Sequence, residues 1–136
     1  MVSTHLKQLS TSALLILLIA KEAVCINNGL GLTPGMGWNT WNKFGCNINE
    51  EVIKSNARRL LDLGLDKVGY RYVNLDDCWL LANRDSNGHV IVDPIKFPKG
   101  MTELGNYIHS LGLKFGIYNS AGTMTCQKLA GSLTYE

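Results

Sequence analysis

Residues 70–79 read YRYVNLDDCW, and this stretch decides the fold. Its first six residues are aromatic and aliphatic side chains interspersed with polar ones, which predicts a strand over 70–75. Two carboxylates, Asp76 and Asp77, follow directly. Charged side chains are rarely buried without a partner. A strand that ends on two of them therefore indicates an open edge rimmed by loops, where a ligand can bind.

Helical and strand patterns alternate on both sides of this strand. The predicted elements are, in order, a strand at 36–38, a helix at 49–65 with Asn49 as N-cap and Gly64 as its stop, the strand at 70–75, a hairpin-like excursion at 84–93 around Asn87 and Gly88, a helix at 100–113 and a strand at 114–122. This β-α-β-α-β order favours an α/β fold with a parallel sheet and right-handed crossovers.

Trp38, Asp76 and Tyr118 fall at the predicted carboxyl ends of three successive strands. Ligands bind at this edge in α/β folds, whether the sheet is a barrel or doubly wound. A (β/α)8 barrel needs about 250 residues, and this chain of 136 supplies only three strands. The last residues, 126–136, carry no visible structural stop. We therefore expect a truncated chain.

The amino-terminal segment 1–25 is predicted to be a secretory signal peptide. Positive charge precedes the apolar run 13–20, and small residues follow it. Lys21 and Glu22 end the run far short of the roughly 20 apolar residues that a membrane span needs. We expect a single domain at 26–136, a route through the secretory pathway to an extracellular, lysosomal or vacuolar destination, and no membrane partner after cleavage.

Composition and cysteine usage restrict the partners. The formal net charge is +2 and no run of Lys or Arg occurs, which argues against nucleic acid. Cys46 and Cys78 fall in loops on the same predicted face, so a bridge between them is sterically plausible, whereas Cys126 has no evident partner. The histidines show no ligand spacing with these thiols, so we expect neither a metal site nor a cofactor.

Four readings of Asp76 and Asp77 remain open on the residues alone. They could be a catalytic pair, although neighbours on a strand point to opposite faces, or ligands of a divalent metal. They could equally be a turn cap beside a solvated carboxylate. The reading we favour is charge-assisted hydrogen bonding to a polyhydroxylated ligand, with the indole faces of Trp38 and Trp79 packed on the apolar face of a sugar.

Four segments, taken together and in order, resemble a known family. They are GLGLTPGMGWNTWNKFGCNINEE at 29–51, YRYVNLDDCW at 70–79, RDSNGHVIVDPIKFPKGM at 84–101 and LGLKFGIYNSAGTMTC at 111–126. They resemble the amino-terminal part of the melibiase-type α-galactosidases, a group of retaining glycoside hydrolases that also includes α-N-acetylgalactosaminidases. The resemblance covers Gly29 to about Tyr135.

The resemblance implies the first three βα units of a (β/α)8 TIM barrel; the antiparallel β domain that follows in the family is absent here. It implies a Cys46–Cys78 disulfide, and for Cys126 a partner just after the nucleophile, in a segment that is missing. The substrate-binding residues it implies are Trp38, Asp76, Asp77, Tyr118 and Cys126.

The implied activity is removal of terminal α-linked galactose from oligosaccharides or glycoconjugates by double displacement. Both catalytic Asp residues would come from strands beyond Glu136, so no catalytic residue is expected within this chain and residues 1–136 should be inactive alone. An α-N-acetylgalactosaminidase is the alternative enzyme, and a secreted galactose-binding remnant is the alternative from another class. An α-galactoside is the expected partner, and a homodimer of the full-length protein is compatible with the resemblance.

Overall fold

The computed structural model describes residues 28–135. The predicted signal peptide lies outside these residues and stays a prediction. Residues from Thr33 onward form one unit with its own core. Among residues 28–135 no helix combines the length and the apolarity that a membrane span requires.

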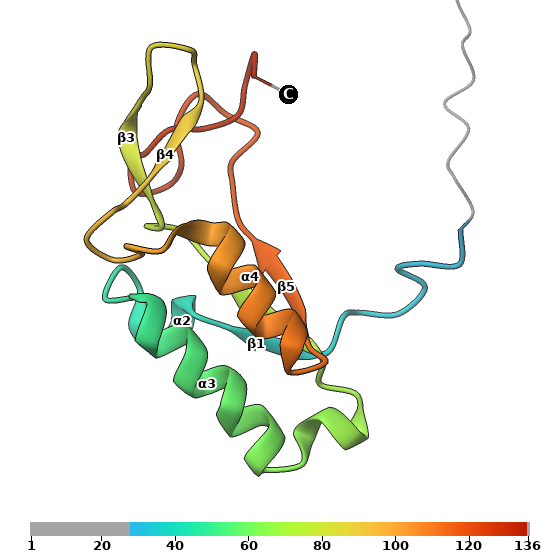
Figure 1. Ribbon diagram of the computed structural model, residues 1–136. Helices are drawn as coiled ribbons and strands as arrows, with labels where there is room; N and C mark the ends of the chain where they lie inside the picture. The colour runs from blue at the N-terminus through green and yellow to red at the C-terminus, as the bar shows by residue number, and fades with distance from the viewer. Residues whose placement is uncertain (1–27, 136) are drawn as a thin grey trace, which may run out of the picture. The chain divides into compact units, whose positions relative to one another are not determined.

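A parallel three-stranded sheet organises this unit (Figure 1). Its strands are β1 (Gly37–Asn39), β2 (Tyr72–Leu75) and β5 (Lys114–Ile117), in the order β1-β2-β5. Trp38 pairs with Val73, and Val73 with Phe115. The predicted α/β class and the parallel sheet are therefore confirmed.

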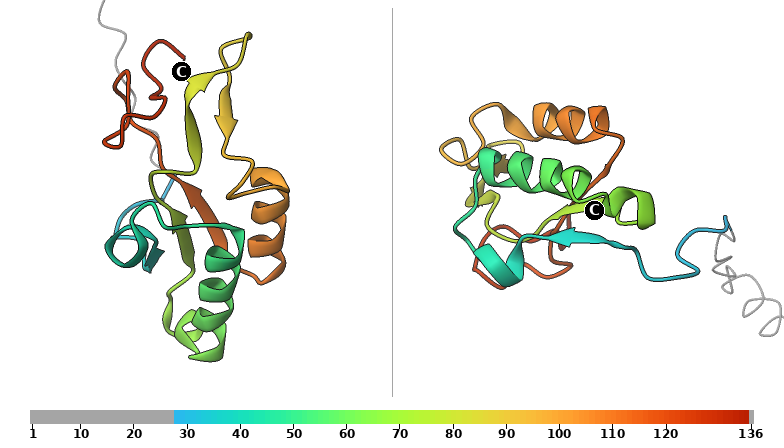
Figure 2. Two further views of the ribbon diagram at one scale, coloured as in Figure 1. Left: turned by 90° about the vertical axis from the view of Figure 1, so that its left-hand side faces the viewer. Right: turned by 90° about the horizontal axis from the view of Figure 1, so that it is seen from below.

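Helices connect these strands. They are α2 (Trp41–Phe44), α3 (Glu50–Asp62), the 3₁₀ helix η1 (Leu65–Val68) and α4 (Gly100–Ser110). The long helices α3 and α4 lie side by side on one face of the sheet (Figure 2). Asn49 caps α3 as predicted, because its Oδ1 accepts a hydrogen bond from the Val52 amide at 2.9 Å.

The core lies between the two helices and the sheet. Alternation along β2 buries Val73 and Leu75 against this helical layer. The core cluster also contains Ile53, Ala57, Leu60, Phe97, Leu104, Ile108 and Leu113. Asn74 faces the other side of the sheet, close to Gly116 on β5, where an added methyl group would overlap the Asn74 amide. The face away from the helices is therefore polar and crowded near the strand ends.

Several predicted boundaries are shifted, including the start of β2 at Tyr72 instead of residue 70 and the end of α4 at Ser110 instead of residue 113. Strand β1 runs one residue further than predicted, to Asn39, so Trp38 is its middle residue and not its end. Helix α3 ends at Asp62, and Gly64 has a left-handed φ of 67°, so the predicted stop at Gly64 is confirmed although the helical pattern ran on to residue 65. Strand β5 ends at Ile117, and the residues after it form loops instead of the predicted strand to residue 122.

The predicted excursion after β2 is an antiparallel hairpin of β3 (Leu80–Arg84) and β4 (Val90–Val92). Arg84 ties it to the last part of the chain. Its Nη1 donates to the Gly88 carbonyl oxygen at 2.7 Å, its Nη2 donates to the Gly131 carbonyl oxygen, and its guanidinium lies 3.8 Å from the centre of the Tyr135 ring. Arg84 thus links the hairpin to the segment after β5.

Acid should loosen the tip of this hairpin. The backbone hydrogen bond from His89, at 2.8 Å, followed by that from Asn87, holds the pKa of Asp85 below its ordinary value. A carboxylate with a lowered folded pKa stabilises the folded turn above its unfolded pKa, and the contribution is lost as the pH falls through the folded value. In the full-length protein, the ¹³C shift of the Asp85 carboxylate should titrate below the ordinary Asp range.

The matched variant is Asp85→Asn. In the unchanged protein the protection factor of the His89 amide should fall in acid, and in Asp85→Asn it should no longer change with pH. A midpoint for Asp85 at or above the ordinary value for aspartate would contradict this account of the turn.

Candidate active site

The carboxyl ends of the three parallel strands meet at one edge of the sheet. Because the strands are parallel and in register, Asn39, Asp76 and Tyr118 are neighbours there. A hollow of about 220 Å³ opens between them, with Asn74 and Gly116 among the residues that line it. The open, polar strand edge predicted from residues 70–79 is therefore present.

A second hollow, of about 180 Å³, adjoins the first. It is lined by Trp41, Asp76, Asp77, Tyr118 and Cys126. Asp76 and Tyr118 line both hollows. The structure thus brings together Asp76, Asp77, Tyr118 and Cys126, leaves out Trp38 and Trp79, and adds Trp41.

Asp76 is oriented by donors on both of its carboxylate oxygens. Its Oδ1 accepts a hydrogen bond from the Asp77 amide at 2.8 Å, and its Oδ2 accepts one from Asn39 Nδ2 at 2.8 Å. Its own amide donates to Thr40 Oγ1 at 3.0 Å, and Thr40 is fully buried. Each oxygen has a second lone pair, so the carboxylate is fixed in place and can still accept a hydrogen bond from a ligand.

Asp77 is buried, with 2% of its surface exposed. Its Oδ1 accepts from the Cys78 amide at 2.8 Å, and its Oδ2 accepts from the Gln127 amide at 3.1 Å. The second bond joins the turn after β2 to the loop after β5. Cys126, which precedes Gln127 in that loop, is thereby held against the hollow.

The tryptophans do not lie where the sequence placed them. Trp38 packs edge-on against Phe44, with ring centres 6.1 Å apart, and is not among the residues lining either hollow. Trp79 is 6% exposed, and its Nε1 donates to the Tyr118 carbonyl oxygen at 2.8 Å, so its faces belong to the core and the prediction that it stacks on a sugar was wrong. Trp41 lines the second hollow instead.

The sequence prediction placed the end of the first strand at Trp38 and therefore did not include Trp41 in the site. A usable signal was present in the GWNTWN segment, because an asparagine side chain commonly accepts a hydrogen bond from the backbone two residues further on, which here is Trp41. In the structure, Asn39 Oδ1 accepts from the Trp41 amide at 2.8 Å while Asn39 Nδ2 binds Asp76. One asparagine therefore positions both the indole and the carboxylate.

Tyr118 faces Cys126 across the second hollow. Its hydroxyl donates to Cys126 Sγ at 3.9 Å. This hydrogen bond, followed by desolvation and by the nearby Cys126 and Asp77, raises the pKa of Tyr118 above its ordinary value. The phenol is therefore neutral at physiological pH, and offers the hollow an aromatic wall and a hydroxyl group, not a base.

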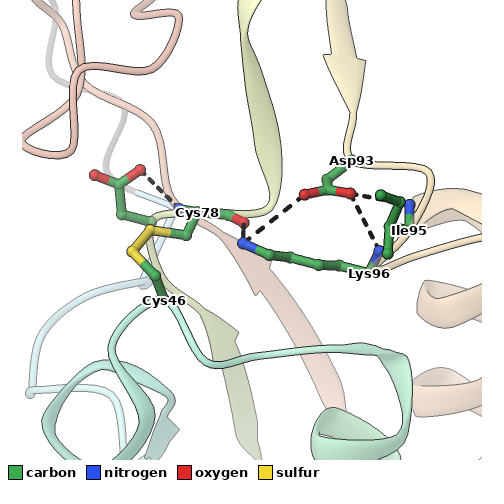
Figure 3. Close-up of polar contacts among 6 residues, drawn as sticks. Cys46, Cys78, Asp93, Ile95 and Lys96 are labelled. Atoms are coloured by element: carbon green, nitrogen blue, oxygen red, sulfur yellow. Dashed lines mark hydrogen bonds and ion pairs between the residues drawn. A yellow bond between two sulfur atoms is a disulfide. The ribbon is translucent and has the colours of Figure 1, made fainter.

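The turn that carries the two carboxylates is covalently fixed. Cys46, in the loop after α2, forms a disulfide with Cys78, with Cα atoms 5.2 Å apart (Figure 3). This confirms the predicted pair. Cys126 is a free, exposed thiol in the structure. No group of three or more His, Cys, Asp or Glu side chains is placed to hold a metal ion within residues 28–135.

A larger hollow, of about 440 Å³, lies elsewhere, between α3 and α4. The cationic groups of Lys54 and Arg58 lie over the Tyr107 ring, 4.9 and 5.6 Å from its centre, and Glu51 and Asp62 complete the lining. These solvated charges form the outer face of two helices. The strand-end hollows, in contrast, combine fixed acceptors with aromatic walls, and we take them as the site.

Two fixed carboxylates lie beside an indole and a phenol at the carboxyl ends of parallel strands, an arrangement of an α/β protein that is suited to a polyhydroxylated ligand. Comparison with known proteins narrows this class. The family model described as Alpha galactosidase A (Melibiase_2) matches residues 33–136. The chain therefore belongs to this α-galactosidase family of glycoside hydrolases.

Individual relatives agree with this assignment. A probable α-galactosidase of Dictyostelium discoideum is 52% identical over 126 residues, which are 92% of this chain and 32% of that protein. The crystal structure of α-galactosidase I from Mortierella vinacea superposes with a TM-score of 0.78 at 53% identity, covering 81% of this chain and 28% of that one. The α-galactosidase of Saccharomyces cerevisiae solved with raffinose has a TM-score of 0.77 at 48% identity, covering 80% and 24%.

The chain spans about a third or less of the length of these relatives. The matched part is the parallel sheet with its strand-end site.

Proposed function

We propose that the protein to which these residues belong removes terminal α-linked galactose from oligosaccharides or glycoconjugates by a retaining double displacement. The observation that carries the proposal is the strand-end hollow in which Asp76 and Asp77 are each fixed by protein donors. Family membership supports the reaction class. Raffinose, the sugar in the Saccharomyces cerevisiae structure, carries a terminal α-galactose, and we infer the same class of substrate here.

Each residue of the hollow has a task in this proposal. The Asp76 and Asp77 carboxylates accept charge-assisted hydrogen bonds from galactose hydroxyls through their remaining lone pairs. The Trp41 indole packs on the apolar face of the ring, and Tyr118 borders the anomeric centre. Cys126 completes the wall. We give the stacking role to Trp41 because Trp38 packs on Phe44, in the short helix that begins with Trp41.

The catalytic groups belong, in this proposal, to later strands of a (β/α)8 barrel. Retention needs a nucleophilic carboxylate and an acid/base about 5 to 5.5 Å apart across the glycosidic bond, and the neighbouring Asp76 and Asp77 are both engaged in orienting hydrogen bonds. Strands β1 and β5 each lack a second partner among the described residues, so both edges of the sheet are available for further strands. Residues 1–136 alone are then inactive, and the predicted signal peptide sends the protein along the secretory pathway.

The test is hydrolysis by the full-length protein of p-nitrophenyl α-D-galactoside, with the β-galactoside and the α-N-acetylgalactosaminide as matched substrates. We expect hydrolysis of the α-galactoside, with α-galactose as the first product seen by NMR. Preference for the N-acetylated substrate would support the α-N-acetylgalactosaminidase alternative. β-Galactose as the first product would exclude retention, and binding of galactose without hydrolysis of any substrate would support the sugar-binding remnant.

A further inference from the structure

Lys96, a lysine outside both hollows, holds the turn that carries Asp76 and Asp77. Its Nζ donates to the Cys78 carbonyl oxygen at 2.9 Å, across 18 residues of sequence. The same Nζ lies 3.8 Å from Asp93 Oδ2 (Figure 3). Lys96, paired with Asp93, thus contacts the turn at 76–78 from outside the two hollows.

Cys78 needs such support because its backbone is strained. Its φ is +78°, in the left-handed region that side chains other than glycine rarely adopt. The side chain and both backbone polar groups of Cys78 have bonding partners. The thiol bonds to Cys46, the amide donates to Asp77 Oδ1, and the carbonyl accepts from Lys96 Nζ. Among residues 28–135, Lys96 Nζ is the one hydrogen-bond donor to this carbonyl.

The loop that carries Lys96 is itself fixed, and this orients the Lys96 ammonium group toward Cys78. Asp93 Oδ1 accepts hydrogen bonds from the Ile95 and Lys96 amides, at 2.9 and 3.2 Å, which closes a tight turn (Figure 3). That turn is docked at both ends: the Asp93 amide donates to the Trp79 carbonyl oxygen at 2.9 Å, and the Lys96 carbonyl accepts from the Glu50 amide at 3.0 Å. Through its hydrogen bond to Cys78, the lysine therefore holds the turn at 76–78 against a fixed loop.

The geometry of Asp77 depends on this arrangement. Its carboxylate lies between the Cys78 amide and the Gln127 amide, at 2.8 and 3.1 Å. If the Cys78 carbonyl loses its ammonium donor, a largely buried acceptor is left unpaired, and the residue can relax from the left-handed region toward ordinary φ. That rotation moves the Cys78 amide, and with it the carboxylate and its bond to Gln127.

We propose that Lys96, oriented by Asp93, is a positioning residue for galactose binding, which acts through the Cys78 carbonyl on the Asp76 and Asp77 carboxylates. The inference rests on the proposed function for its ligand, while its structural part stands independently. If Lys96 served only to pair with Asp93, its loss would change the stability of the protein and leave the affinity for galactose unchanged. The two roles therefore differ in what a change at Lys96 does to the sugar site.

The experiment compares Lys96→Met, Lys96→Arg and Lys114→Met in the full-length protein. Lys114 is the matched control, because its side chain is exposed and lies at the start of β5 away from the site. Among residues 28–135 its Nζ donates to Tyr72 Oη, at 3.4 Å, and not to the turn at 76–78. We expect Lys96→Met to raise the galactose dissociation constant about tenfold or more, as for loss of a charge-assisted hydrogen bond. Lys96→Arg should recover most of the affinity, and Lys114→Met should bind as the unchanged protein does.

A second readout needs no sugar. The exchange rate of the Gln127 amide, followed by mass spectrometry with fragmentation, should rise in Lys96→Met and stay unchanged in Lys114→Met, because that amide donates to Asp77 Oδ2. Should Lys96→Met fail to fold, Asp93→Asn replaces it, with the same two effects in weaker form.

Unchanged affinity and unchanged Gln127 exchange in a folded Lys96→Met protein would overturn the proposal. An equal loss in Lys96→Met and Lys96→Arg would also contradict the positioning role. If the unchanged protein binds no galactose, the proposed function fails, and the Gln127 exchange rate alone decides for or against the positioning of the turn.

Discussion

Removal of the Cys46–Cys78 disulfide is expected to lower the free energy of unfolding of the full-length protein by about 4 kcal/mol. The bridge closes a loop with a sequence separation of 32 residues, which includes all of α3 and β2. Loop-closure entropy for a crosslink of this length gives a cost of about 4 kcal/mol. The loss should reach the site as well, because Cys78 directly follows the two carboxylates.

The measurement is guanidinium unfolding of Cys46→Ala, Cys78→Ala and the double variant. Because the bridge needs both sulfur atoms, each single variant should cost nearly as much as the pair, so the effects should be strongly non-additive. Additive single effects, or equal unfolding midpoints for the oxidised and the reduced protein, would show that the bridge contributes little.

Changing either carboxylate to its amide is expected to lower kcat/KM for an α-galactoside by about a hundredfold or more. In Asp76→Asn and Asp77→Asn the charge is lost, and hydrogen bonds to charged groups contribute about 1.5–3 kcal/mol each. Geometry adds to this, because both oxygens of each carboxylate accept bonds from protein donors. An amide can satisfy only one of the two, so its NH₂ group faces another donor.

Asp62→Asn is the matched control for this prediction, since Asp62 lies at the end of α3 beside the larger, charged hollow. We expect it to keep the full kcat/KM. Retention of activity in Asp76→Asn and Asp77→Asn, or an equal loss in Asp62→Asn, would contradict the assignment of the sugar site. Circular dichroism on each variant separates lost activity from lost structure.

The parallel sheet was predictable because its signals are local. The alternation in YRYVNL gave a strand that the structure places at Tyr72–Leu75, and Asn49 marked the start of α3 by the same side-chain hydrogen bond that the structure contains. Asp76 and Tyr118 were predictable for a related reason, since parallel strands bring their carboxyl ends to one edge.

The aromatic wall was not predictable in the same way. The predicted end of β1 was one residue too early, which placed Trp38 at the site instead of Trp41. Trp41 lines the hollow because its amide donates to Asn39 Oδ1, which closes a turn. Trp79 shows the converse: it packs in the core, and its Nε1 donates to the Tyr118 carbonyl oxygen 39 residues away, a contact between loops that no local pattern predicts.

Lys96 also depends on tertiary structure. Its link to Cys78 joins two loops across the fold, and no local pattern in DPIKFP marks that contact. Sequence patterns thus predicted the elements and the site edge, whereas contacts between loops had to come from the structure.

A crystal structure of the full-length protein with galactose is the most direct test of the sugar site. Our account predicts that the galactose hydroxyls lie within hydrogen-bond distance of Asp76 and Asp77, with the Trp41 indole against the apolar face of the ring and Tyr118 near the anomeric carbon. Galactose bound elsewhere, with both carboxylates of the turn free of the sugar, would contradict it.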